Sequence, residues 1–245
     1  MTWIVLPLVG LASGIVAGIL GVGGGTILVP AMVFLGIEAH SAIGTSTLAM
    51  IFTSLSGTMR NHAKGGLQVA AVIQIGIASL LGAQGGAFLT TLLKTRTLEI
   101  LFAILLILIT VSGMRKRNLE KRAATRWIVA ARIFIGITGG FLSGLFGIGG
   151  GILMVPLQIL LLGEDLVSAV KTSLGVIVIT AIGATFAHAM HGHVLLLEGL
   201  TLGAGGVIGA QIGTRLLPLI PQKVVKVTFA ILSFALAGAL AIGSN

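Results

Sequence analysis

Long apolar blocks follow one another along almost the whole chain, and they leave it few ways to fold. Eight blocks are long enough to cross a bilayer as helices: 3–20, 41–60, 68–92, 98–114, 127–146, 166–190, 194–217 and 223–243. Two more, 26–36 and 152–162, are too short at about 1.5 Å per residue to cross a core of about 30 Å. Barrel strands would alternate polar with apolar residues, and that alternation is absent. The expected class is an all-α, multi-pass membrane protein.

The composition excludes a soluble protein and a nucleic-acid partner. Charged residues make up 9% of the chain, against about 25% in soluble domains. The net charge of +9 would suit nucleic acid, but six of the fifteen basic residues fall in 115–126, between two apolar blocks. Basic residues beside membrane helices set topology. Residues 1–20 lack a basic leader and are interpreted as the first membrane segment, in the plasma or inner membrane.

The two halves of the chain match each other in order. The phrase GILGVGGGTILVP at 18–30 reappears as GLFGIGGGILMVP at 144–156, an offset of 126. SAIGTST at 41–47 matches SAVKTSL at 168–174 and GAQ at 82–84 matches GAQ at 209–211, both with an offset of 127. The predicted organisation is an N-terminal repeat (1–114), a basic cytoplasmic linker (115–126) and a C-terminal repeat (127–245).

Lysine and arginine positions favour inverted repeats. If the linker is cytoplasmic and each half crosses the membrane an odd number of times, the basic residues near Arg60 and Arg215 also face the cytoplasm. Only Lys94 and Arg96 then form a basic loop outside. The positive-inside rule prefers this arrangement. It requires the two short blocks to count as crossings.

The doubled glycine phrase predicts a break in a helix at each site. Glycines four apart let membrane helices pack closely, and the pairs Gly14/Gly18, Gly82/Gly86, Gly140/Gly144 and Gly209/Gly213 are interpreted this way. Three consecutive glycines cost about 1 kcal/mol each in a helix interior, so they are a poor choice for packing alone. A break that starts a new short helix presents free N–H groups, which attract anions. Two equivalent breaks indicate one site between the halves.

Paired polar residues inside apolar blocks add possible ligands. The hydroxyls of Thr45 and Ser46, like those of Thr172 and Ser173, could donate to an anion or bond to their own helix. Lys171 has no counterpart in the first half and is a functional residue if it lies in the hydrocarbon. Gln84 and Gln211 could bind substrate or bridge helices. The predicted substrate-binding residues are Gly21, Gly23, Gly24, Gly25, Thr45, Ser46, Gln84, Gly147, Gly149, Gly150, Gly151, Lys171, Thr172, Ser173 and Gln211.

The sequence gives little indication of catalysis, a metal or a cofactor. His188, aligned with His62, forms a cluster with His191 and His193 that could ligate zinc, but a loop at the membrane face is the preferred interpretation. Asn61 has no match in this alignment. The chain has no cysteine, which excludes disulfides and thiolate sites. No metal site, no cofactor and no enzyme activity are predicted.

At the doubled G-x-G-G-G-x-x-x-V-P phrase and the GTS and KTS segments, the chain resembles the TauE/SafE family of membrane permeases over residues 5–243. The resemblance implies transport of a sulfur-containing anion such as sulfite, sulfoacetate or a related organosulfonate. The resemblance also implies that the glycine phrases and the Thr-Ser pairs are site residues. Lys171 departs from the twofold pattern, because the first half has Gly44 at the matching position.

The expected function is therefore alternating-access transport of a small anion at a site between two repeats. The expected partners are that anion and the lipid bilayer, and a homo-oligomer stays open. The alternatives are a permease for another small solute, an intramembrane metalloenzyme using the His188 cluster, and an assembly subunit without transport.

Overall fold

The computed structural model describes residues 2–65, 67–94 and 127–221, together with isolated positions at 96, 97, 100, 101, 104, 224 and 227. Every regular element in these residues is a helix. In chain order they are α1 (Thr2–Leu20), α2 (Gly25–Phe34), α3 (Ala39–Ala63), α4 (Val69–Leu92), α6 (Ile128–Phe146), α7 (Gly151–Leu157), the π-helix η2 (Gln158–Leu162), α8 (Leu166–Met190), α9 (Leu196–Leu216) and the short 3₁₀ helix η3 (Leu217–Leu219). The linker 115–126 and most of the blocks 98–114 and 223–243 lie outside the described residues.

Four of the described helices are long and apolar enough to cross a membrane: α4, α6, α8 and the continuous segment Leu196–Leu219. The expected count of eight is therefore not reached. Two blocks lie mostly outside the described residues, and α1 contributes only a shorter apolar stretch, Ile4–Leu20. Helix α3 has 25 residues but carries many hydroxyls. Because it packs against α2, α8 and α9, most of those hydroxyls form hydrogen bonds inside the protein and need no apolar face toward lipid.

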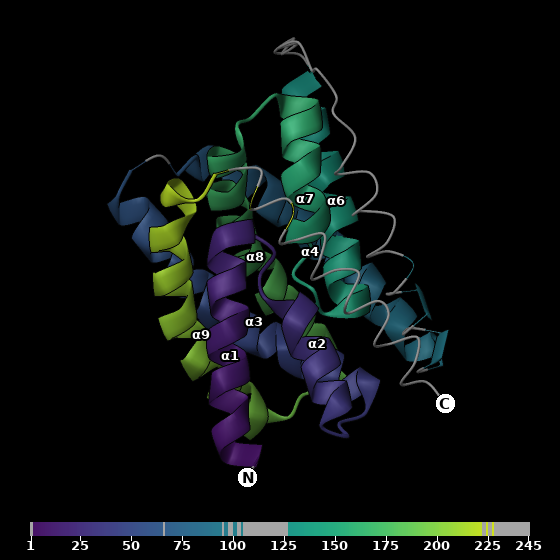
Figure 1. Ribbon diagram of the computed structural model, residues 1–245. Coiled ribbons are helices and arrows are strands. Elements are labelled where there is room, and N and C mark those ends of the chain that lie inside the picture. The colour runs from purple at the N-terminus through teal and green to yellow at the C-terminus, as the bar shows by residue number, and fades with distance from the viewer. Residues whose placement is uncertain are drawn as a thin grey trace.

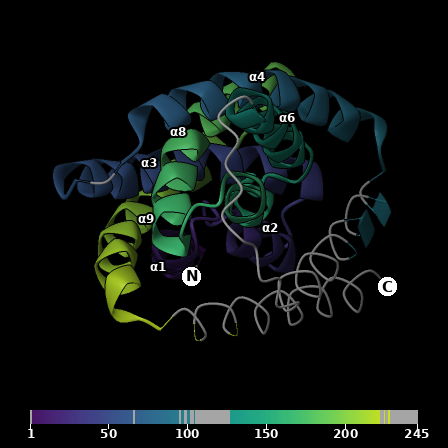
Figure 2. The ribbon, with the colours of Figure 1, turned by 90° about the horizontal axis from the view of Figure 1, so that it is seen from above.

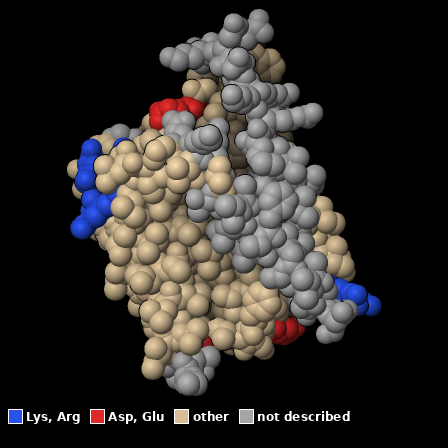
Figure 3. Space-filling view, in the orientation of Figure 1, with Lys and Arg blue, Asp and Glu red and all other residues tan. Residues whose placement is uncertain are grey.

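The surface supports a membrane setting. Large apolar side chains project outward from several helices, for example Leu81 at 73% exposure, Phe186 at 64% and Ile208 at 58%. On the face shown in Figure 3, charged side chains lie toward the two ends, and the described surface between them is uncharged. Exposed apolar area of this extent marks a surface made for lipid or a partner.

Helices of one half of the chain pack against helices of the other half, and we call the two closest such pairs, α1 with α9 and α6 with α4, the exchanged pairs. Helix α1 lies along α9, and α6 lies along α4 (Figure 1). Helices α3 and α8 pack against each other and hold α9 and α4 on their outer sides. Seen from above, α2 lies near the middle, with α4 and α9 at the periphery (Figure 2).

Glycines make the two exchanged pairs possible. A Cβ at Gly14 or Gly18 would overlap the backbone of α9, and a Cβ at Gly140 or Gly144 would overlap the backbone of α4. The glycine pairs of α4 and α9 are equally tight: Gly82 and Gly86 touch α6, and Gly209 and Gly213 touch α1. The packing interpretation of these four pairs is confirmed. Close backbone approach supplies the dispersion contacts that hold helices together in lipid.

Helix α8 begins with a side-chain cap. The Asp165 carboxylate accepts hydrogen bonds from the Ser168 backbone N–H at 3.0 Å and from its hydroxyl at 2.6 Å. These bonds hold the pKa of Asp165 below its usual range. They satisfy one of the free N–H groups with which every helix starts.

Replacing Asp165 with alanine is expected to cost about 1 kcal/mol of stability at neutral pH. Because the folded pKa is depressed, this contribution is complete above the unfolded pKa and is lost as the pH falls through the folded pKa. The matched variant Asp165→Asn keeps a capping oxygen and should show a flat response. Thermal unfolding in detergent at several pH values checks this. A loss for Asp165→Ala that persists at strongly acid pH would contradict it.

Candidate functional site

Both glycine phrases interrupt a helix, as the sequence predicts. Helix α1 ends at Leu20 and α2 begins at Gly25, and α6 ends at Phe146 and α7 begins at Gly151. The same three glycines of each phrase have positive φ: Gly21 (69°), Gly23 (79°) and Gly24 (86°), and Gly147 (65°), Gly149 (79°) and Gly150 (68°). This backbone conformation is open to glycine and strained for other residues. We call 21–24 and 147–150 the first and second break.

The two breaks lie in direct contact. A Cβ at Gly25 would overlap the carbonyl oxygen of Gly147 and come within 2.7 Å of the Ile148 Cα. A Cβ at Gly151 would likewise overlap the Gly21 carbonyl and come within 2.8 Å of the Val22 Cα. All residues of both breaks are buried. The structure therefore brings together the two phrases that the sequence places 126 residues apart.

Each break contains buried N–H groups without acceptors. Among the hydrogen bonds of the described residues, none is donated by the backbone of residues 22–24 or 148–150. Buried N–H groups that lack a partner are rare, because each costs free energy. Six such donors at two touching breaks are a ready-made environment for the oxygens of an anion.

The carbonyls of the breaks are bound across the two halves. The Ser173 hydroxyl donates to the Gly21 carbonyl at 2.8 Å, and the Ser46 hydroxyl donates to the Gly147 carbonyl at 2.8 Å. Ser46 also lies 2.7 Å from the Ile43 carbonyl of its own helix. In this conformation the two serines hold each break to the opposite half. The sequence offers two interpretations for Ser46, an anion ligand or a bond to its own helix. Neither includes this bond to the opposite half, which we call the cross-connection.

The two threonines next to these serines differ. Thr45 Oγ1 accepts from the Leu195 N–H at 3.0 Å and so fixes the turn between α8 and α9. Thr172 is fully buried, and its hydroxyl has no hydrogen-bond partner among the described residues. It follows Lys171 and precedes Ser173, on the stretch of α8 where Val170 packs against Gly21. Of the four hydroxyls, only that of Thr172 is unengaged in the described residues.

The other predicted polar ligands point elsewhere. Lys171 Nζ donates to the Gly65 carbonyl at 3.3 Å, in the turn after α3. Gln84 donates to the Gly183 carbonyl at 3.0 Å, and Gln211 donates to the Ser56 carbonyl at 3.0 Å. These contacts favour the helix-bridging interpretation of both glutamines and an interfacial position for Lys171.

Two residues at the breaks escaped the sequence analysis. The Met50 sulfur lies 3.0 Å from where a Cβ would be at either Gly23 or Gly149, so it packs against both breaks. The Ser13 hydroxyl donates to the Gly24 carbonyl at 3.0 Å. The sequence indicated the site through residues that are identical in the two halves. Neither Met50 nor Ser13 has an identical residue at the matching position of the other half.

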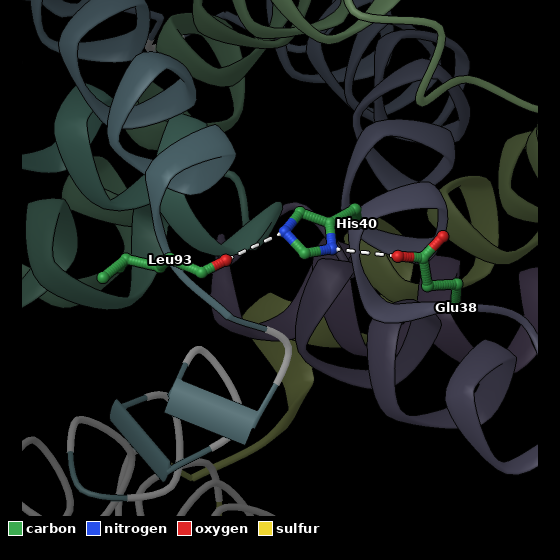
Figure 4. Close-up of polar contacts among 3 residues, drawn as sticks. All are labelled: Glu38, His40 and Leu93. Carbon is green, nitrogen blue, oxygen red and sulfur yellow. Dashed lines mark hydrogen bonds and ion pairs between the residues drawn. The ribbon is translucent and has the colours of Figure 1, made fainter.

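Histidines gather at the end of the molecule where α3 and α9 begin. His40 lies between the Glu38 carboxylate (3.2 Å to Nδ1) and the Leu93 carbonyl (3.1 Å to Nε2), so it links the start of α3 to the end of α4 (Figure 4). His191 is exposed and His193 is partly buried in the turn after α8. His188 is fully buried, so the expectation of a loop position is wrong for this residue.

The histidine cluster does not gather as metal ligands. Within the described ranges, no group of three histidine, aspartate or glutamate side chains is arranged to hold a metal ion. The alignment of His188 with His62 is also corrected. His62 is exposed, whereas Asn61, 127 residues before His188, is buried at 4% exposure. The offset of 127, which relates Thr45 to Thr172, pairs His188 with Asn61.

Comparison with known proteins places the chain among transporters. A sequence profile of the family described as sulfite exporter TauE/SafE matches residues 6–240. The probable membrane transporter protein YunE of Bacillus subtilis (strain 168) is 31% identical over 242 residues, covering 88% of this chain and 89% of that protein. YdhB of the same organism is 30% identical over 93% of this chain and 95% of its own length. MJ0441 of Methanocaldococcus jannaschii, also a probable membrane transporter protein, is 32% identical over 75% of this chain and 71% of its own length.

Proposed function

This chain belongs to the sulfite exporter TauE/SafE family and is a membrane transporter, and from that premise we propose that its cargo is a small anion bound between the two breaks. The six buried N–H groups that find no acceptor among the described residues carry this proposal. Each is a donor, and together they can replace the hydration of a sulfur oxyanion such as sulfite, sulfoacetate or a related organosulfonate. Backbone donors suit this task in lipid because they bring no full positive charge that must stay compensated when the anion leaves.

The transport step is a separation of the two breaks. They touch now, held by the Ser46 and Ser173 bonds to Gly147 and Gly21. Movement of one half against the other would open the N–H groups to one side of the membrane and then to the other, which is alternating access. In that motion the Ser46 and Ser173 hydroxyls leave the carbonyl oxygens and donate to an oxygen of the anion. The Thr172 hydroxyl, which has no partner among the described residues, supplies a third donor.

We propose that the halves, 1–114 and 127–245, are inverted repeats joined by the cytoplasmic linker 115–126. The exchanged pairs α1·α9 and α6·α4 support this, as does the symmetry of the serine bonds. In Figure 1 the α2–α3 connection lies at the bottom and the α7–α8 connection at the top, as inversion requires.

The arrangement of charge supports one orientation in the plasma or inner membrane. Lys171 is bound to the turn after α3, which also carries Arg60 and Lys64. Glu38 and the histidine cluster lie at the opposite end, near Lys94. By the positive-inside rule, the end with the α3–α4 turn faces the cytoplasm, and the histidine cluster faces outward.

A binding experiment with one matched pair of variants tests the proposed cargo. The thermal stability of the detergent-purified protein would be measured with sulfite, sulfoacetate, thiosulfate, sulfate, taurine, chloride and phosphate. A ligand present at about 100 times its dissociation constant stabilises the protein by about 2.7 kcal/mol. We expect a sulfur oxyanion to stabilise the protein most.

Thr172→Val should reduce that stabilisation without harming the free protein, because the hydroxyl it removes has no partner among the described residues and its removal is neutral or favourable. The control Thr138→Val on α6, whose hydroxyl bonds its own helix at 2.7 Å, should keep the full response. Equal stabilisation by every anion, or an unchanged response in Thr172→Val, would contradict the site.

A further inference from the structure

His188 presents a bare basic nitrogen inside the protein. Its Nε2 lies 2.8 Å from the Gly144 carbonyl oxygen. A carbonyl only accepts, so Nε2 carries the proton and Nδ1 is the unprotonated nitrogen. This Nδ1 is buried and has no hydrogen-bond partner in the part of the chain that the structure describes. The side chain is therefore built to receive one proton at Nδ1.

The position of His188 connects it to the proposed anion site. Gly144 lies in the last turn of α6, three residues before Gly147. On its other side His188 packs on α3, where a Cβ at Gly44 would come within 3.0 Å of the His188 Cβ. Gly44 is two residues before Ser46, which binds the Gly147 carbonyl. His188 thus lies between the two chain segments that approach the second break.

Histidines lead from the surface to His188. The backbone N–H groups of His191 and His193 both donate to the His188 carbonyl, at 3.2 and 3.0 Å. The His193 ring lies 6.2 Å from that of the exposed His191 and 5.4 Å from that of His40. Exposure decreases from His191 through His193 to His188. His191 and His193 therefore lie between water and the end of α8 that carries the buried His188.

The charges around His193 favour passing a proton on over holding it at this residue. His193, His191 and His40 are the titratable groups that act on His188 among the described residues. Burial lowers the pKa of His193, His40 and His191 lower it further, and Glu38 opposes them. The two ring nitrogens of His40 face the Glu38 carboxylate and the Leu93 carbonyl. The exposed Lys94 follows the Leu93 that His40 binds.

We propose that His188 is a proton-binding site of the transporter, loaded from the histidine end through His191 and His193, and that its proton travels with the anion. Protonation at Nδ1 creates an imidazolium beside the second break, and the new N–H needs an acceptor that an anion oxygen supplies. Proton and anion therefore promote each other's binding, and the pair crosses with less net charge. The proposal rests on the proposed anion transport.

The decisive experiment follows protons and anion together in proteoliposomes. Vesicles containing the purified full chain and an internal pH dye would receive an outward gradient of sulfoacetate, and radiolabelled sulfoacetate counterflow would be measured in parallel. The wild-type protein should move protons in the direction of the anion. Anion counterflow without any proton movement in the wild type would overturn the proton site and leave the anion transport standing.

Two histidine variants locate the site. His188→Asn introduces the residue found at the buried position 61 and keeps a side-chain donor for Gly144. We expect it to lose proton movement, and its sulfoacetate counterflow should be weaker than that of the wild type and should no longer depend on pH. His191→Asn, at the exposed end, should keep most of both. Undiminished proton movement in His188→Asn would overturn the proposal.

If the wild type shows no sulfoacetate counterflow, the anion proposal fails for that substrate, and a readout that needs no substrate decides the proton site. Nitrogen-15 histidine spectra of the wild-type protein in detergent should show one buried imidazole that changes from an unprotonated to a protonated Nδ1 as the pH is lowered from about 7 to about 3. If every histidine that titrates remains in the spectrum of His188→Asn, the proposal is wrong.

Discussion

Replacing Gly25 with alanine should destabilise the protein strongly and stop transport. The new methyl group would overlap the Gly147 carbonyl oxygen, and the Ile148 Cα lies 2.7 Å away. Both atoms are backbone, so no side chain can move aside to relieve the overlap. Overpacking of a tight site costs about 1–3 kcal/mol, and here the only relief is to push the two breaks apart. Gly151→Ala should behave in the same way against Gly21 and Val22.

Gly85→Ala is the matched control. Gly85 lies in α4 and is exposed, and the nearest atom to its new Cβ would be the Phe141 ring at 3.9 Å. Alanine is the better helix former by about 1 kcal/mol, so this variant should be neutral or more stable. Thermal unfolding and sulfoacetate counterflow compare the three proteins. Equal stability of Gly25→Ala and Gly85→Ala would show that the breaks do not touch in the membrane.

Removing the Ser173 hydroxyl should give the second large effect. Ser173→Ala leaves the buried Gly21 carbonyl without its donor at 2.8 Å, and an unsatisfied buried acceptor costs about 1–3 kcal/mol. Ser46→Ala should do the same at Gly147. Because both bonds hold the breaks together, we also expect faster hydrogen exchange in the residues around both breaks.

The control for these two variants is Ser54→Ala. Ser54 is buried in α3, but its hydroxyl donates to the Met50 carbonyl of its own helix at 2.5 Å. That carbonyl already takes part in the helix, so the loss should be small. Hydrogen exchange and thermal unfolding would be measured for all three variants. A loss for Ser173→Ala no larger than for Ser54→Ala would mean that the cross-connection contributes nothing to holding the breaks.

The sequence predicts the breaks well and their surroundings less well. Consecutive glycines such as Gly23 and Gly24 are unfavourable in any helix, so a local rule located both breaks. Glycine spacing likewise predicted close helix packing at Gly14 and Gly140. Glycine spacing indicates that a helix packs closely against another helix, but it does not identify that other helix. The pairing of α1 with α9 and of α6 with α4 therefore could not be predicted from the spacing.

The roles of the polar residues were harder to predict because they depend on which acceptor lies nearest in space. For Ser173 the sequence left an anion ligand or a bond to its own helix open, and in this structure its hydroxyl binds the Gly21 carbonyl. Gln84 and Gln211 left two interpretations open, and their contacts across helices favour one of them. For His188, grouped with His191 and His193, a loop at the membrane face was the preferred interpretation. A helix that continues to Met190 buries it instead.

The pairing of α1 with α9 also has a consequence for biosynthesis. Helix α1 leaves the ribosome well before α9, and its glycine face fits that later helix. Until α9 has been inserted, that face is covered by lipid or by another protein, and the same delay separates α4 from α6 to a smaller extent. Neither half holds both members of an exchanged pair, so each half expressed alone would lack the partner for its own first helix. Assembly of the bundle is therefore a late event that follows synthesis of α9.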